Sequence, residues 1–69
     1  MPFYDALNFV LNTAQGRVRR LGWADGVFIK RSYSNGYTII YLHKPDDVVL
    51  YQPSNEDLVA RDWVQIRGE

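Results

Sequence analysis

Two short stretches of the chain carry the side chains best suited to ligand binding. In the first, Arg19 and Arg20 come just before Trp23. A guanidinium binds a phosphate through two parallel N–H groups, and an indole face stacks on a nucleobase with a free energy of about 1–3 kcal/mol. These residue types indicate a surface that holds a flat, anionic molecule. The alternative, a solvated strand face beside a core tryptophan, is the one that composition alone favours.

The second stretch contains Ser54 and Asp57, and their spacing has two explanations. A serine followed three residues later by an acidic residue is typical of a capping box at the start of a helix. A helix N-terminus also attracts anions, and a hydroxyl beside a carboxylate can bind ribose hydroxyls. The spacing alone does not separate a cap from a ligand site.

Three tyrosines suggest a further aromatic surface. Tyr37 and Tyr41 point to one side of an expected strand, and in this interpretation Tyr33 lies across a hairpin from one of them. A cross-strand aromatic ladder at a subunit interface and a ligand-stacking wall both explain this pattern. The two explanations are compatible.

The sequence offers little support for catalysis. Nucleophilic catalysis needs an activated Ser, Cys or Lys beside a base, whereas His43 is the only histidine and has no adjacent serine. Asp46 and Asp47 belong to a turn that contains a proline, where solvated side chains are the usual explanation. No phosphate loop or metal-ligand spacing is present. We therefore expect a binding protein without catalytic activity, cofactor or metal.

The chain of 69 residues is expected to form one domain over residues 1–69. A domain of this size buries only about 60% of the surface that its unfolded chain exposes. Because the sequence has no cysteine, disulfides cannot compensate, and homo-oligomerisation remains as the means of burying more surface.

The charge and hydropathy of the sequence limit the classes of partner that the protein can bind. Lys plus Arg and Asp plus Glu are both 8, which argues against a DNA or RNA polymer as partner, because non-specific binding needs an excess of cations. No apolar run approaches the roughly 20 residues that span a bilayer. We expect a soluble, cytoplasmic protein that does not associate with membranes.

The apolar residues near the start follow a helical period, and they are Phe3, Ala6, Leu7, Val10, Leu11 and Ala14. They predict a helix over about residues 3–15, closed by Gly16 in a left-handed cap. Strands are predicted at 17–21, 27–31, 37–43, 48–51 and 63–67, with a two-residue turn at Asn35-Gly36 and a short helix beginning at Pro53-Ser54. The predicted fold class is α+β, a small single domain. Its N-terminal helix packs on a mainly antiparallel sheet, and the short second helix precedes the last strand.

Two segments together resemble the Thoeris anti-defence type-two family of small bacteriophage proteins. They are Gly16-Arg17-Val18-Arg19-Arg20-Leu21-Gly22-Trp23 and Pro53-Ser54-Asn55-Glu56-Asp57-Leu58-Val59-Ala60-Arg61-Asp62-Trp63. The resemblance covers nearly the whole chain, and the second segment is its most specific part. The chain departs from the family at Tyr51, where Trp is frequent, at Ala24, where Asn is common, and in the less typical section 27–49.

The resemblance implies a sponge that is not an enzyme. Such proteins bind the cyclic nucleotide signal of a host immune sensor in the host bacterial cytoplasm and keep it intact, so that the effector is not triggered. The ligands of the family are glyco-cyclic ADP-ribose isomers and, for some members, cyclic oligonucleotides. Its members are homotetramers with ligand pockets at subunit interfaces.

The resemblance also implies roles for particular residues. Trp23 would stack on a base, Arg20 would contact phosphate, and Ser54 and Asp57 would lie near the ligand. We add Arg19 and Tyr33 as candidate ligand-binding residues on the chemistry given above, and we expect Trp63 to be a packing anchor. The alternatives are a small homo-oligomeric protein-interaction module that inhibits a host factor through its aromatic surface, and a nucleic-acid accessory protein.

Overall fold

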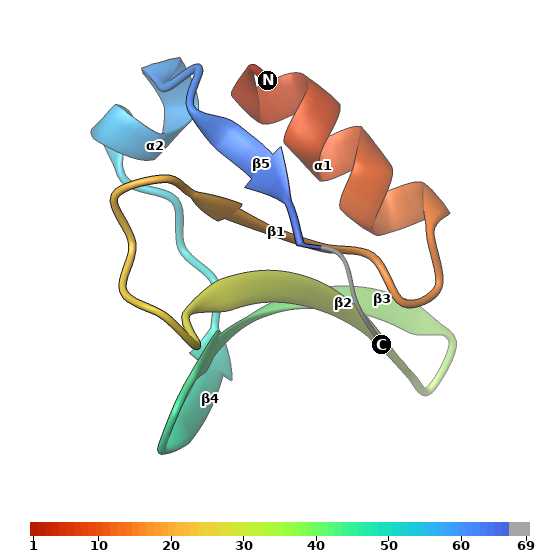
Figure 1. Ribbon diagram of the computed structural model, residues 1–69. Coiled ribbons are helices and arrows are strands. Elements are labelled where there is room, and N and C mark those ends of the chain that lie inside the picture. Colours follow the sequence, from red (N-terminus) through yellow and green to blue (C-terminus); the bar gives the residue numbers. More distant parts are fainter. Residues whose placement is uncertain (67–69) are drawn as a thin grey trace.

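The computed structural model describes residues 1–66. They form an antiparallel sheet with one long helix packed on it (Figure 1). The five strands lie in the order β4-β3-β2-β1-β5. The element bounds are α1 Phe3–Asn12, β1 Arg17–Arg20, β2 Phe28–Ser34, β3 Tyr37–Lys44, β4 Asp47–Leu50, α2 Asn55–Val59 and β5 Trp63–Gln65. The predicted α+β fold is confirmed in its element order and in the antiparallel pairing of the sheet.

Two predicted element bounds are wrong by three residues. The first helix ends at Asn12 rather than near residue 15, because Thr13 already has an extended backbone. Strand β2 continues to Ser34 rather than residue 31, because its pairing with β3 runs without a break up to the turn. Arg67, which was expected in the last strand, lies outside the described residues. None of the helices in residues 1–66 is long and apolar enough to cross a lipid bilayer.

Gly16 is not the left-handed cap that the sequence predicts. Gly26 and Gly36 are the described glycines with a positive φ. Gly16 is buried, and its N–H donates to the carbonyl of Thr13 at 3.0 Å. A Cβ at this position would lie 2.9 Å from Cβ of Thr13 and 3.0 Å from the Phe9 ring. Gly16 is therefore explained by the close approach of the chain to α1.

The turn between β2 and β3 has the backbone that its sequence predicts. Asn35 and Gly36 have φ of 52° and 83°, as both central residues of a type I′ turn require. This turn pairs Ser34 with Tyr37 and fixes the register of the whole hairpin. The strongest short-range signal in the sequence is confirmed.

The same register shows that the expected placement of Tyr33 across from Tyr37 or Tyr41 is wrong. Tyr33 pairs with Thr38, and residues that are paired across strands share a face of the sheet. Because side chains alternate along a strand, Tyr37 and Tyr41 point to the opposite face from Thr38. No aromatic ladder joins Tyr33 to Tyr37 or Tyr41.

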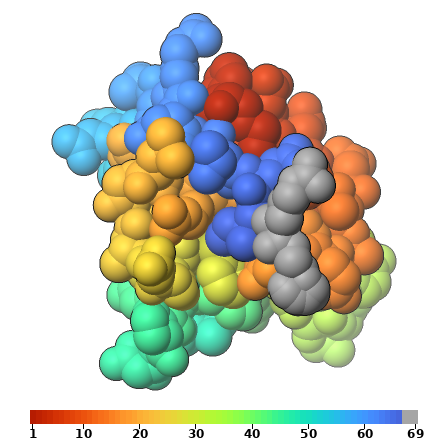
Figure 2. Space-filling view, in the orientation of Figure 1, coloured from red at the N-terminus to blue at the C-terminus, as the bar shows by residue number. Residues whose placement is uncertain are grey.

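The core lies between α1 and one face of the sheet. Its fully buried side chains are Ala6, Val10, Val18, Ile29 and Trp63. Ala6 and Val10 share one side of α1 because they are four residues apart, and Val18 pairs with Ile29 across β1 and β2. In the space-filling view α1 and β5 lie against each other (Figure 2). Trp63 confirms the expectation of a packing anchor.

The type I′ turn can be tested by a pair of glycine substitutions. Gly36→Ala should lower the free energy of unfolding by about 1–2 kcal/mol, because an L-residue is strained at this positive φ. Gly22→Ala is the matched control, since Gly22 lacks a positive φ and a Cβ there meets no atom within 4 Å. Urea unfolding followed by tryptophan fluorescence measures both. Equal stabilities of the two variants would contradict the turn geometry.

Candidate functional site

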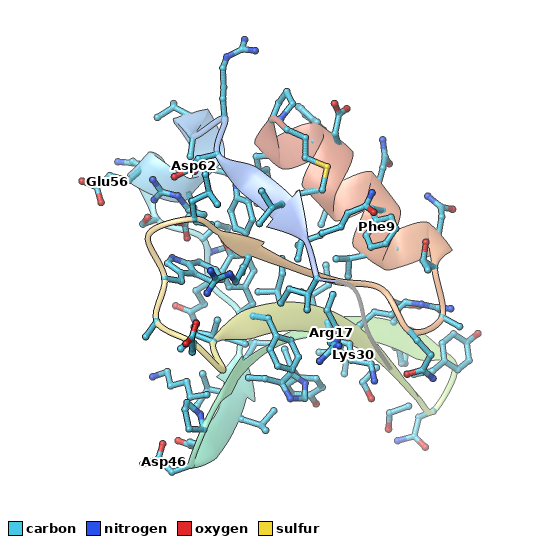
Figure 3. The ribbon with its side chains drawn as sticks, in the orientation of Figure 1. Phe9, Arg17, Lys30, Asp46, Glu56 and Asp62 are labelled. Atoms are coloured by element: carbon cyan, nitrogen blue, oxygen red, sulfur yellow. The ribbon has the colours of Figure 1, made fainter. Side chains whose placement is uncertain are left out.

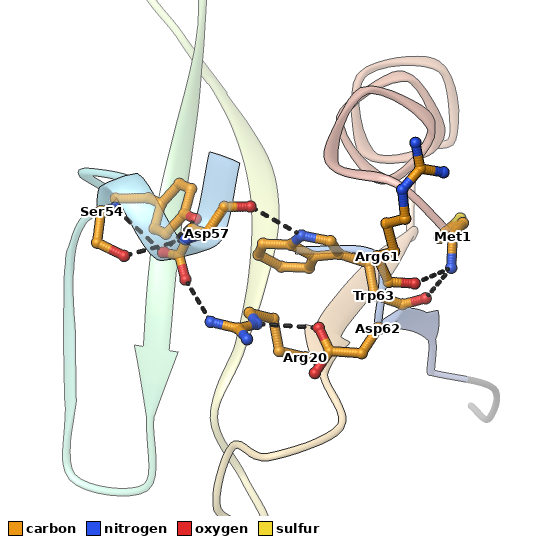
Figure 4. A network of polar contacts seen from close by, with 8 residues as sticks. Met1, Arg20, Ser54, Asp57, Arg61, Asp62 and Trp63 are labelled. Atoms are coloured by element: carbon orange, nitrogen blue, oxygen red, sulfur yellow. Dashed lines mark hydrogen bonds and ion pairs between the residues drawn. The ribbon is translucent and has the colours of Figure 1, made fainter. Parts of the chain in front are cut away.

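Arg20, Ser54 and Asp57, which the sequence singles out separately, meet in one polar network (Figure 4). Arg20 ends β1, and its guanidinium reaches two carboxylates. Nη1 lies 3.3 Å from Oδ1 of Asp57, and Nε lies 3.0 Å from Oδ1 of Asp62. The network joins β1 to α2 and to the segment that precedes β5.

The buried carboxylate of Asp57 is the centre of this network. Asp57 is only 8% exposed. Its Oδ2 accepts from the Tyr51 hydroxyl at 2.8 Å and from the Ser54 backbone N–H at 3.3 Å. Its own N–H donates to Oγ of Ser54 at 3.1 Å, which completes a capping box. The structure thus contains the cap, and α2, with only five residues, depends on such support.

The shifted pKa values of Tyr51 and Asp62 keep both side chains in the protonation states that their hydrogen bonds need. Burial raises the pKa of Tyr51, and the hydrogen bond to Asp57 raises it further, so the phenol remains a neutral donor. The hydrogen bond from Arg20 lowers the pKa of Asp62. The Arg20 guanidinium is already paired with the carboxylates of Asp57 and Asp62, and these two negative charges would repel an approaching phosphate. The geometry therefore favours a structural role for Arg20 over phosphate binding.

Trp23 lies beside this network and packs against the core. Its ring makes edge contacts with Trp63, at a centroid distance of 5.2 Å, and with Tyr51, at 6.5 Å. The Trp63 indole N–H in turn donates to the Asp57 carbonyl at 3.2 Å. Trp23 is half-buried, so it joins the network to the core and exposes only part of its ring.

Arg19 and Tyr33 lie apart from the network. Arg19 points to the other face of β1 from Arg20, and its Nη1 donates to the Trp23 carbonyl at 3.1 Å. It also lies 3.6 Å from the exposed carboxylate of Asp25. Tyr33 is 70% exposed near the tip of the β2–β3 hairpin, at the opposite end of the molecule from α2 (Figure 1). A single chain therefore brings Arg20, Ser54 and Asp57 together but does not bring Arg19 and Tyr33 to them.

Sequence reasoning missed the parts that Tyr51 and Asp62 have in the network. The available signals were an aromatic residue three positions before the capping serine and an acidic residue directly before Trp63. Neither signal identifies its partner, because Arg20 is 42 residues from Asp62 in the sequence. Only the pairing of β1 with β5 brings them together.

Replacing Tyr51 tests the support of the buried carboxylate. Tyr51→Phe should lower the free energy of unfolding by about 1.5–3 kcal/mol, because Asp57 loses a hydrogen bond to a charged group. A domain of this size has a total stability of roughly 3–10 kcal/mol, so the loss is large. Urea unfolding measures it. Tyr37→Phe, at a tyrosine that is 71% exposed, is the control, and an equal effect of both changes would contradict the network.

The Arg20–Asp62 pair should also make stability depend on pH. Since the pKa of Asp62 is lowered in the folded protein, the unfolded chain binds the proton first as the pH falls. The stabilisation is complete above the ordinary aspartate pKa of about 3.9 and is lost as the pH falls through the lower folded value. Asp62→Asn should flatten this acid decline in urea midpoints measured from neutral to acidic pH. Asp46→Asn, in the exposed β3–β4 turn, should keep the wild-type profile, and the same profile in both variants would refute the assignment.

Comparison with known proteins identifies the family of this chain. The sequence matches the family model of the Tad2-like, Thoeris anti-defense 2-like domain over residues 1–66. A search of the curated proteins gave no match. The capping serine, the buried aspartate and Trp63 all belong to the segment on which the resemblance was based. Because the matched range covers nearly the whole chain, the protein belongs to the Thoeris anti-defense 2-like family and has the anti-defence role that this family implies.

Proposed function

We propose that the protein is a sponge that binds cyclic nucleotide second messengers and holds them without cleaving them. The ligands are glyco-cyclic ADP-ribose isomers or cyclic oligonucleotides in the host bacterial cytoplasm. The observation that carries this proposal is the family match over residues 1–66, since an anti-defence protein of this family acts against Thoeris signalling. Sequestration keeps the signal from the immune effector.

The contacts of the reactive side chains support binding rather than catalysis. Ser54 and Asp57 hold each other in the capping box, and the His43 ring stacks on Phe28 at a centroid distance of 4.9 Å. None of these three groups is placed as a nucleophile beside a base in the described structure. Binding alone suffices for a sponge, because nanomolar affinity corresponds to about −12 kcal/mol and needs no chemical step.

We also propose that the protein assembles as a homo-oligomer, a tetramer in keeping with the family. Large apolar side chains are exposed near α1 and α2. They are Tyr4 at 78%, Leu21 at 61%, Leu58 at 50% and Val59 at 78%. Exposed apolar groups of this kind are buried when symmetric copies associate. Association would add to a core that has five fully buried apolar side chains among residues 1–66.

The exposed tyrosines of the β2–β3 hairpin favour a second candidate function. Tyr33 and Tyr37 are 70% and 71% exposed on opposite faces of the β2–β3 hairpin. Tyrosine combines a ring with a polar tip and is enriched in protein interfaces. A protein-interaction module that inhibits a host factor would use this hairpin.

Native mass spectrometry of the purified protein with cyclic ADP-ribose isomers and cyclic dinucleotides tests the sponge. We expect a stoichiometric complex on an oligomer and unmodified nucleotide after heat release. Free ligand at 100 times its Kd should raise the free energy of unfolding by about 2.7 kcal/mol.

Other outcomes would contradict this proposal in distinct ways. Recovery of a cleaved nucleotide would show an enzyme. Absence of nucleotide binding together with stoichiometric co-purification of one host protein would favour the interaction module.

A further inference from the structure

Residues 21–27 join β1 to β2 and carry Trp23, and we call them the Trp23 connection. Most of them are exposed, and these are Leu21, Gly22, Ala24, Asp25 and Gly26. Asp25 is the one charged residue among the seven, and its side chain is fully exposed. A segment with so few buried side chains keeps one conformation where other parts of the chain hold it.

The Arg19 guanidinium holds the middle of the Trp23 connection. Two tight turns follow each other there, since the Trp23 N–H donates to the Arg20 carbonyl at 3.1 Å and the Val27 N–H donates to the Ala24 carbonyl at 3.2 Å. Nη1 of Arg19 donates to the Trp23 carbonyl at 3.1 Å and reaches the Ala24 carbonyl at 3.5 Å. One guanidinium thus bridges the junction of the two turns, and its side chain is 24% exposed.

Other contacts anchor the two ends of the Trp23 connection. The Leu21 N–H donates to the Asp62 carbonyl at 3.1 Å. At the other end, a Cβ at Gly26 would lie 3.1 Å from Cγ of Pro45, so the second turn packs closely on the β3–β4 turn. In Figure 3 the connection runs from near Asp62 toward the β3–β4 turn. Neither anchor contacts the middle of the connection, which leaves the Arg19 guanidinium to hold the backbone of Trp23.

The Trp23 ring has a rigid support of its own. Trp63, which it contacts at a centroid distance of 5.2 Å, is fully buried. Tyr51, at 6.5 Å, is held by the hydrogen bond from its hydroxyl to Asp57. The ring is therefore fixed on the core side by other rings and on the backbone side by Arg19, while part of it stays exposed.

We propose that Arg19 is a positioning residue for nucleotide binding, which holds the backbone of Trp23 so that the exposed part of the ring meets a nucleobase in one orientation. This inference rests on the proposed sponge function with Trp23 as the stacking ring. Arg19 does not bind the phosphate itself, because its guanidinium is occupied by two carbonyls and lies 3.6 Å from the Asp25 carboxylate. A ring that is already oriented binds more tightly, since the ligand does not have to order it.

Matched arginine variants test the contribution of Arg19 to binding. Arg19→Met keeps an unbranched apolar side chain and removes every donor, and it should weaken the binding of cyclic ADP-ribose isomers or cyclic dinucleotides by about 10-fold to 100-fold. Arg31→Met is the control, because Nε of Arg31 also donates to a backbone carbonyl, that of Thr13, at 3.4 Å. Thr13 follows the end of α1 that lies away from α2, so the affinity should change by less than about twofold (Figure 1). Isothermal titration calorimetry measures both, and equal affinities would overturn the proposal.

A double-mutant cycle shows whether Arg19 acts through the ring. Trp23→Leu removes the stacking ring and keeps an apolar side chain against the core. If Arg19 acts through Trp23, the variant that carries both Arg19→Met and Trp23→Leu should bind within about twofold of Trp23→Leu alone. Effects of the two changes that multiply would show that Arg19 contacts the ligand independently, and would overturn the positioning role.

The ligand-free protein gives a second readout. In Arg19→Met the Trp23 indole N–H resonance should shift or broaden without any nucleotide, whereas the Trp63 indole N–H should keep its slow exchange with water because it donates to the Asp57 carbonyl. An unchanged Trp23 resonance would overturn the proposal. Arg19→Lys keeps the charge but is too short for the Nη1 contacts, so it should also lose affinity and is the variant to measure if Arg19→Met does not fold. Wild-type affinity in Arg19→Lys would instead indicate a direct charge contact.

The outcomes separate this inference from the function on which it rests. A wild-type protein that binds none of the nucleotides would overturn both. Binding by the wild-type protein together with unchanged affinity in Arg19→Met would keep the sponge and overturn the positioning role.

Discussion

The structure depends on the burial of one carboxylate, that of Asp57. A charged group is removed from water at a high cost unless hydrogen bonds and an opposite charge replace its hydration. Here the Tyr51 hydroxyl, the Ser54 N–H and the Arg20 guanidinium provide them. The donors come from β1 and from the connection between β4 and α2, whereas Asp57 itself belongs to α2. Satisfying the carboxylate therefore fixes the positions of β1, α2 and the chain that leads to α2. The Asp57 carbonyl also accepts a hydrogen bond from the Trp63 indole N–H, which links α2 to the core.

The alternation of side chains along β1 divides its arginines between two tasks. Arg20 points toward α2, where two carboxylates hold it, whereas Arg17 and Arg19 point to the face of the sheet away from α1. A run of cations in sequence looks like one basic site, but the period of two separates neighbouring residues onto opposite faces. The arginines expected to form a single cluster are thus divided between the two faces of the sheet.

Local patterns were enough to predict most elements but not their contacts. Asn35-Gly36 and the Ser54–Asp57 spacing each specify a backbone conformation within a few residues, and both predictions are confirmed. The partners of Arg20 depend on the placement of α2 and on the pairing of β1 with β5, which no local signal encodes. Gly16 was misjudged for the same reason, since its close contact with Phe9 is tertiary.

The residues that identify the family lie largely in the part of the chain that holds the scaffold together. The capping box, Asp62 and Trp63 belong to the most specific matching segment, and in the structure they hold α2 and β5 in place. Strands β2 and β3 lie within the section 27–49 that is less typical of the family. Family membership therefore carries the scaffold over to this chain.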